Sequence, residues 1–173
     1  MIISVSDLKG QVDCGKDAYD AIKARLDGIE HVIRSYTNNA FQVPAVRFCG
    51  RSEGSKIYGD PGQLMVGDTV QVSKSGVNDG LYTVERVEDD GVTLDDMLIE
   101  APRNLVTKVK YPPDVVRCAV RLYEWEQSMG GKVGVKSETV SRHSVTYEDS
   151  QTLFAGYPVG ILNGLKLYAK ARF

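Results

Sequence analysis

The sequence lacks long hydrophobic runs and is poor in cysteine. No stretch of 18 apolar residues occurs among the 173 residues, so we expect no membrane span. The first five residues, Met1 to Val5, have no basic region and no long apolar stretch, so we expect no signal peptide. The three cysteines, Cys14, Cys49 and Cys118, are odd in number and far apart, which suits a reducing cytoplasm.

Signatures of catalysis are also missing. The sequence contains neither a GxSxG motif nor a P-loop, and its two histidines, His31 and His143, belong to no metal-ligand pair. The run Gly76 to Gly80 reads GVNDG between two predicted strands, so we interpret it as a turn. The pairs Asp89-Asp90 and Asp95-Asp96 flank one strand, but their spacing matches no calcium loop. We therefore expect no enzyme, no cofactor and no metal site.

The net charge is only −2, but the charge is unevenly distributed along the chain. Residues 1–100 hold 10 Lys or Arg against 17 Asp or Glu, whereas residues 101–173 hold 11 against 6. An acidic front and a basic back suit subunits that pack head to tail around a ring. Two solvated faces of a monomer would give the same pattern.

Helical periodicity occupies both ends of the chain. A short helix is predicted over 7–12 and a long one over 17–36, and a third follows Pro112-Pro113-Asp114 as far as Met129. Trp125 lies on the apolar face of the third helix, so we expect it to be a buried anchor. A terminal helix is predicted over 159–171. Apolar positions recur at three- and four-residue steps in the two long helices, at Ala18, Ile22, Leu26, Ile29, Ile33 and Tyr36, and at Val115, Cys118, Ala119, Leu122, Trp125 and Met129.

The pattern changes between Val43 and Tyr111 to short apolar alternations broken by glycine. Strands are predicted at 45–48, 56–58, 68–73, 81–88, 92–94 and 105–109, with a hairpin turn at Asn78-Asp79-Gly80. The predicted fold class is α+β: a small α-helical bundle with an inserted antiparallel β module, either a small barrel or a folded sheet. The predicted domains are 1–42 plus 112–173 for the helical part and 43–111 for the insert.

The last third of the chain carries a spaced pattern of motifs. Tyr111-Pro112-Pro113 precedes the Trp-bearing helix, which ends in Met-Gly-Gly; then come Val135-Lys136-Ser137-Glu138, Ser144-Val145-Thr146-Tyr147, and Gly156-Tyr157-Pro158 followed by Ile161-Leu162, Leu165 and Tyr168. This order resembles the head–tail connector (adaptor or head-completion) proteins of tailed bacteriophages. The short connectors of that family are all-helical, so the β module departs from them.

That resemblance implies a structural virion protein at the head–tail interface, made in the host bacterial cytoplasm. It would dock on the portal protein as a ring of about twelve copies, extend the DNA channel, and offer a platform to a downstream stopper or tail-terminator protein. Non-specific contact with DNA in the channel is also implied. No membrane and no cofactor are involved.

The segment from Val135 to Tyr147 alternates like a strand but is largely polar on both faces. Such a strand has a weakly specified register, and its backbone edges can pair with another chain. Basic residues of the terminal helix are expected beside it. The predicted partner-binding residues are Val135, Ser137, Thr139, Ser141, Arg142, Lys166, Lys170, Arg172 and Phe173.

Two other function classes stay open at this stage. A DNA-binding regulator could use the basic terminal helix, because a stripe of cations can meet phosphates. A small hydrolase could use carboxylates of the β module, although no catalytic constellation is evident there.

Overall fold

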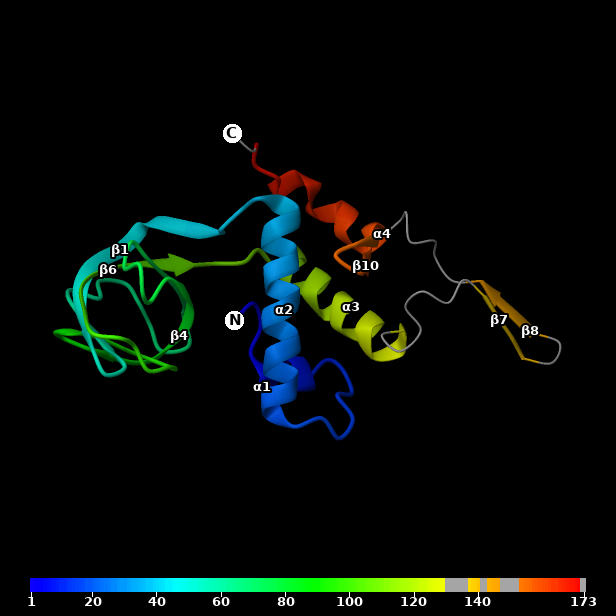
Figure 1. The fold of residues 1–173 in the computed structure, drawn as a ribbon, viewed down its shortest axis with the longest axis horizontal. Coiled ribbons are helices and arrows are strands. Elements are labelled where there is room, and N and C mark those ends of the chain that lie inside the picture. Colours follow the sequence, from blue (N-terminus) through cyan, green and yellow to red (C-terminus); the bar gives the residue numbers. More distant parts are fainter. Residues whose placement is uncertain (130–136, 141–142, 147–152, 172–173) are drawn as a thin grey trace. The chain divides into compact units, whose positions relative to one another are not determined.

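The computed structural model describes residues 1–129, 137–140, 143–146 and 153–171. The chain divides into two compact units. Ala40–Tyr111 together with Met1 forms a β-barrel unit, and Ile2–Asn39 together with Pro112–Phe173 forms a helical unit. The colours of Figure 1 show that the chain leaves the helical unit after α2 and returns to it at α3.

The predicted fold class, a helical bundle with an inserted module, is wrong. The dominant ordered element is a closed barrel of six antiparallel strands, and the described residues include only four α-helices. Two of these helices, α1 (Val5–Lys9) and α4 (Val159–Leu162), are five and four residues long. Helices this short present too little apolar surface to build a bundle, so the long-range strand pairing sets the fold class.

The barrel closes because β1 and β6, which are far apart in sequence, pair with each other. The strands are β1 (Gln42–Glu53), β2 (Lys56–Tyr58), β3 (Thr69–Ser73), β4 (Gly80–Glu88), β5 (Gly91–Leu94) and β6 (Ala101–Val109). Their order around the barrel is β1-β2-β5-β4-β3-β6, and every neighbouring pair is antiparallel. Closure leaves no sheet edge in this unit that could pair with another chain.

The barrel interior is filled mainly by aliphatic side chains that alternate along the strands. Leu64 and Leu98 enter the core from loops rather than strands. Two glycines permit close backbone contact, because a Cβ atom at Gly50 would lie 1.6 Å from the carbonyl oxygen of Tyr58 and one at Gly91 would lie 2.3 Å from that of Ile57. The buried core residues are Ile57, Leu64, Val70, Val72, Val84, Val92, Leu94, Leu98 and Val106.

The helical unit is built around α2 (Tyr19–Thr37) and α3 (Pro113–Met129), which confirm the two long helices predicted from the sequence. Helix α2 buries its stripe of Ile22, Leu26, Ile29 and Ile33, and Asn38 ends it in the left-handed conformation with φ 47°. Helix α3 buries Val115, Ala119, Leu122 and Tyr123. Trp125 is only partly buried, so it is not the fully enclosed anchor that its position on the stripe predicts.

The end of the chain differs from the single terminal helix predicted over 159–171. Four α-helical residues in α4 are followed by a 3₁₀ helix over Asn163–Tyr168. Two small sheets complete this unit. Strand β7 (Ser137–Val140) pairs with β8 (His143–Thr146), and β9 (Leu153–Phe154) pairs with β10 (Tyr157–Pro158) through a turn in which Ala155 and Gly156 have φ of 49° and 86°.

Candidate assembly surfaces

The structure locates only part of the predicted partner-binding set. Lys166 and Lys170 are exposed on the same terminal segment, and Ser137 and Thr139 lie in β7. The remaining residues, Val135, Ser141, Arg142, Arg172 and Phe173, lie outside the described residues. The expected proximity of the basic terminal residues to the strand segment therefore stays a prediction.

The β7–β8 hairpin is a sheet of only two strands. Ser137 is opposite Thr146 and Val140 is opposite His143, and in the described sheets neither strand pairs with any other. Each strand therefore has one edge without a ladder partner among the described strands. Two-stranded sheets are marginally stable alone, and open edges bind further strands readily.

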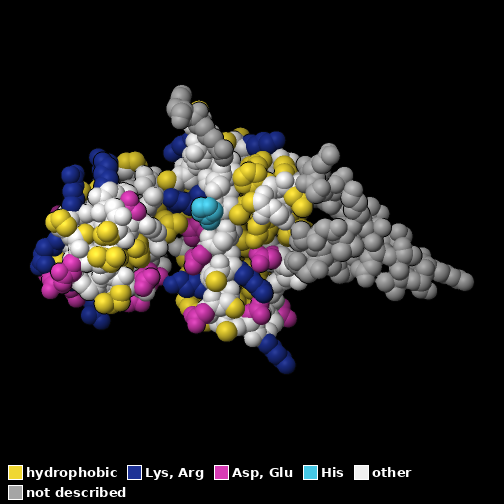
Figure 2. Space-filling model, in the orientation of Figure 1, with side chains coloured by type: hydrophobic (Ala, Val, Ile, Leu, Met, Phe, Trp, Pro, Cys, Tyr) yellow, Lys and Arg dark blue, Asp and Glu magenta, His cyan; other side chains and the backbone are white. Residues whose placement is uncertain are grey.

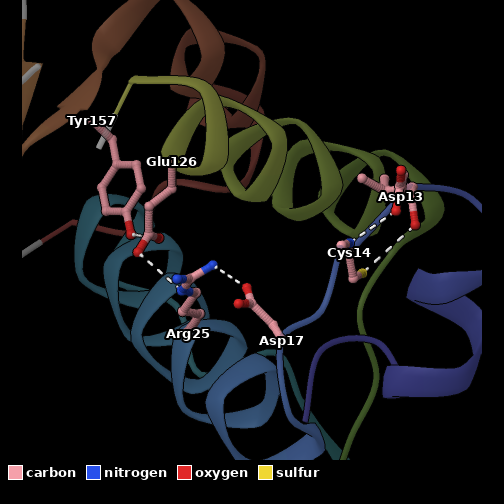
Figure 3. Close-up of polar contacts among 8 residues, drawn as sticks. Asp13, Cys14, Asp17, Arg25, Glu126 and Tyr157 are labelled. Atoms are coloured by element: carbon pink, nitrogen blue, oxygen red, sulfur yellow. Dashed lines mark hydrogen bonds and ion pairs between the residues drawn. The ribbon is translucent and has the colours of Figure 1, made fainter. Parts of the chain in front are cut away.

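The ends of the segment that carries this hairpin are held together by a polar cluster (Figure 3). On the α3 side, Glu126 accepts a hydrogen bond of 2.8 Å from the hydroxyl of Tyr157 in β10. The other carboxylate oxygen of Glu126 lies 3.9 Å from Nε of Arg25 on α2, and Arg25 pairs with Asp17 at 2.7 Å. We call Asp17, Arg25, Glu126 and Tyr157 the clamp, because they link the residues on both sides of 130–152.

Aromatic contacts reinforce the clamp. The rings of Trp125 and Tyr157 lie 5.7 Å apart in a tilted arrangement, and Phe154 in β9 meets Tyr36 of α2 edge-on at 5.2 Å. Burial and the hydrogen bond to Glu126 raise the pKa of Tyr157, so its hydroxyl stays protonated and remains a donor. The base of the hairpin segment is therefore fixed to both long helices.

A hollow of about 510 Å³ lies beside the clamp. Its ionisable lining residues include Asp17, Arg25 and Glu126, which already engage one another in the clamp. The thiol that lines this hollow is that of Cys14. On α3, burial raises the pKa of the Cys118 thiol to about 11, so that thiol is protonated at neutral pH and a poor nucleophile. No group of three or more acidic, histidine or cysteine side chains that could hold a metal ion occurs among the described residues.

The terminal segment around Lys166 and Lys170 has a fixed backbone. The amide of Lys170 donates to the carbonyl of Thr37 at 2.8 Å, and Asn39 Nδ2 donates to the carbonyl of Tyr168 at 3.0 Å. The Tyr168 hydroxyl contacts both carboxylate oxygens of Asp114 at 2.8 Å. The last turn of α2 and the first turn of α3 thus hold this segment in place.

Leu167 is exposed on that fixed segment, and the sequence interpretation overlooked it. Its side chain is 88% exposed, whereas Leu165 is buried. In a 3₁₀ helix, residues three apart share a face, so Leu162, Leu165 and Tyr168 turn inward and Leu167 turns outward. The three-residue spacing of those inward residues is the sequence signal for this arrangement. Lys166 and Lys170 accompany the exposed leucine, so the segment presents an apolar group flanked by cations.

One end of the barrel carries a buried polar network centred on Asn78, in the loop between β3 and β4. The Asn78 side chain donates to the carbonyl of Ile99 at 2.8 Å and accepts from the Ile99 amide at 2.9 Å. It also contacts the buried side chains of Asn104 at 3.0 Å and Ser52 at 3.2 Å. These bonds fix the loop 95–100, which connects β5 to β6 across this end of the barrel.

The fixed loop displays apolar side chains at the surface. Met97 is 74% exposed and Ile99 is 61% exposed, on either side of the buried Leu98. Burial raises the pKa of Tyr82, and the nearby charges of Asp96, Asp95 and Asp79 raise it further, which places these acids around the same end of the barrel. In Figure 2, hydrophobic side chains reach the surface of the barrel beside acidic and basic ones.

Comparison with known proteins gives no family assignment: no family model matches the chain, and no curated protein matches it. Within the described part of the chain, no helix is both long and apolar enough to cross a membrane.

Proposed function

We propose that this chain is a head–tail connector subunit that docks on a portal protein, forms a ring with copies of itself, and serves as a platform for the next ring. The observation that carries the proposal is the β7–β8 hairpin, whose two strands pair only with each other among the described sheets. Added strands from a neighbouring subunit would complete this sheet through backbone hydrogen bonds.

The clamp supports the same proposal. A two-stranded sheet on an unrestrained segment would lose much conformational entropy on binding. Because Glu126 and Tyr157 hold the two ends of 130–152 together, part of this entropy is already lost before any partner binds. Repetition around a ring would then multiply weak contacts, since each subunit is held in place by its neighbours.

The direct test mixes purified protein with portal protein and images the particles by negative-stain electron microscopy. The wild type should form rings on the portal. A variant in which residues 137–146 are replaced by a Gly-Ser linker of equal length should fail to do so. Met65→Ser, which changes an exposed apolar residue of the barrel, is the matched control and should bind like the wild type.

Hydrogen exchange provides a second readout. Amides of 137–140 and 143–146 should exchange faster in the free protein than on the portal, because the partner completes the sheet. Equal and strong protection in both states, or full portal binding after the linker replacement, would contradict the role of the hairpin. Full binding after deletion of residues 169–173 would show that Lys170 and Arg172 are not part of the interface with the portal.

A DNA-binding regulator is the second candidate, and the exposed Lys166 and Lys170 favour it. Phosphate contacts through these lysines would give affinity that falls steeply as salt rises. A salt-dependent shift of duplex DNA by the protein alone, lost in K166E/K170E, would support this function. Retention of portal binding in the same variant would separate the two candidates.

A further inference from the structure

One end of the barrel exposes apolar side chains that do not contribute to the barrel core. Met97 and Ile99 are the apolar side chains that the loop 95–100 displays. Next to them lies an open hollow of about 390 Å³ whose exposed walls come from Arg51, Glu53, Glu100 and Pro102, with Ser52 and Ala101 at its buried base. We call Met97, Ile99 and this hollow the barrel-end surface.

Hydrogen bonds join the base of the hollow to the loop 95–100. Ser52 donates to the carbonyl of Ile99 at 2.7 Å and accepts from the amide of Ala101 at 3.0 Å, so its base is tied to the loop above it. On one wall, Arg51 pairs with Glu53 at 2.8 Å and stacks over the ring of Tyr58 at 4.1 Å. A hollow with a hydrogen-bonded base and the apolar Ile99 at its margin is suited to an inserted side chain.

The charge around this surface is acidic. Glu53 and Glu100 line the hollow, and Asp96 is exposed beside Met97, against the single cation Arg51 among the residues that line the hollow. Arg51 is already engaged with Glu53. The remaining carboxylates favour a partner that brings an apolar group accompanied by positive charge.

The terminal segment of the same chain has these properties. Leu167 is 88% exposed, its backbone is fixed by α2, and Lys166 and Lys170 are exposed on the same segment. We propose that the barrel-end surface binds the Leu167 segment of a second copy of this chain, with Leu167 against Ile99 and the hollow, and the two lysines facing Glu100 and Asp96.

Such a contact joins two different surfaces of identical chains, so it propagates from one copy to the next and closes where the rotation permits. It would give the β-barrel unit a role as the receptor for the neighbouring subunit. The inference rests on the proposed function for its biological setting, but it predicts a contact that the protein alone can be tested for.

Cysteine cross-linking between two copies tests the contact. In a Cys49→Ser background, which removes the exposed native thiol while Cys14 and Cys118 stay buried, one tagged copy carries I99C and one untagged copy carries L167C. Under a mild oxidant the pair should form a disulfide-linked heterodimer. The control places the cysteine at Asp89, which is exposed at the other end of β4 from Asn78, and should give no more than background.

Charge exchange shows whether the contact lies between copies. When both the I99C copy and the L167C copy carry D96K/E100K, or both carry K166E/K170E, the yield of the cross-linked pair should fall. The fall should be roughly tenfold for an interaction change near 1.4 kcal/mol. A mixture of an I99C copy carrying D96K/E100K and an L167C copy carrying K166E/K170E should restore cross-linking. The barrel-end surface is then basic and the Leu167 segment that it meets is acidic. E85K/D89K changes two exposed acids elsewhere on the barrel and should have no effect. Circular dichroism and Trp125 fluorescence verify that every variant is folded.

Three outcomes would overturn the inference: no cross-link between folded I99C and L167C copies, a yield unaffected by charge, or a cross-link that forms only within one chain carrying both cysteines. Failure of the proposed function looks different. A charge-dependent cross-link without rings on the portal would contradict the connector assignment and leave this contact standing. Rings on the portal that form equally well with K166E/K170E would support the connector assignment and contradict this contact.

Discussion

The barrel unit and the helical unit solve the problem of strand edges in opposite ways. In the barrel, β1 pairs with both β2 and β6, so all six strands have two neighbours. In the helical unit, β7 and β8 have only each other among the described strands. One chain can therefore combine a unit whose sheet has no open edge with a unit whose small sheet has open edges that another strand can pair with.

The two units also place their polar clusters differently. Asn78 is 4% exposed and bonds only to protein groups around it. The clamp is more accessible to water, since the Arg25 and Asp17 side chains are 37% and 35% exposed. Loss of a hydrogen bond costs most where water cannot replace the missing partner, so the barrel network should be the more sensitive of the two.

The largest expected effect comes from truncating the core of either unit. Ile57→Ala in the barrel and Leu26→Ala in α2 each remove a fully buried side chain and should cost about 2–5 kcal/mol. The single tryptophan, Trp125, lies in the helical unit and reports that unit alone. In urea, Leu26→Ala should shift the Trp125 fluorescence transition strongly, whereas Ile57→Ala should shift only the barrel signal in circular dichroism.

This pair of variants also tests the predicted domains, 1–42 plus 112–173 and 43–111. An equal shift of the Trp125 transition in both variants would show that the two units unfold together as a single cooperative structure.

The next effect concerns Asn78. Asn78→Ala removes the acceptor of the Ile99 amide and the donor to Asn104 Oδ1, whereas the Ile99 carbonyl keeps its bond from Ser52, so we expect a loss of about 2–4 kcal/mol in the free energy of unfolding. Val77→Ala, at the exposed neighbouring position, should change stability by less than about 0.5 kcal/mol. Thermal melts of both variants make the measurement. Equal melting temperatures would mean that water takes the place of the Asn78 side chain.

A smaller effect is expected at the clamp. Tyr157→Phe removes the hydrogen bond to Glu126 and should cost about 1 kcal/mol, because the site is only partly buried. Tyr19→Phe is the control, since Tyr19 on α2 is 57% exposed and loss of its hydroxyl should be close to neutral. Chemical denaturation followed by Trp125 fluorescence distinguishes the two. A loss in Tyr157→Phe no larger than that in Tyr19→Phe would contradict this account of the clamp.

The smallest effect is a dependence on alkaline pH. Burial raises the pKa of the Cys118 thiol to about 11, above the value near 8.5 of an unfolded cysteine. The folded state therefore favours the neutral thiol, and stability is complete below about pH 8.5 and falls as pH rises toward 11. The difference should reach about 1 kcal/mol by pH 9.5.

Cys118→Ala should reduce this decline, and Cys49→Ala, which removes an exposed thiol, should not. Denaturation midpoints at pH 7, 8.5 and 9.5 provide the comparison, and the slope with pH matters rather than the absolute value. Parallel slopes for the wild type and Cys118→Ala would show that another group controls the alkaline transition.

The sequence predicts the local elements well and the fold class poorly. The stripe from Ile22 to Ile33 identifies α2, because its period is a property of neighbouring residues. Barrel closure depends on pairing such as Phe48 with Val106, which are almost sixty residues apart, and no turn signal encodes that contact. The predicted strand 45–48 is weak in sequence, yet it is the centre of the twelve-residue β1.

The candidate surfaces show the same limit. Lys166 and Lys170 could be recognised as exposed cations from composition alone. The exposure of Leu167 shows only once the three-residue spacing of Leu165 and Tyr168 is interpreted as a 3₁₀ helix. The sequence gives no sign that Met97 and Ile99 are exposed. Their exposure follows from the hydrogen bonds of Asn78 to the backbone of Ile99, which fix the loop. Tertiary hydrogen bonds determine which apolar residues are displayed.

The clamp has a consequence for how freely the chain between its ends can change. Once Glu126 and Tyr157 join the flanks of 130–152, the free energy of closing that loop grows only slowly with its length, by about 0.6 kcal/mol for each doubling. We therefore expect insertions or deletions there to cost the helical unit little stability, since the cores of α2 and α3 lie outside this range. A contact between the flanks of a variable segment would let related chains change their binding specificity there while the scaffold on either side keeps its fold.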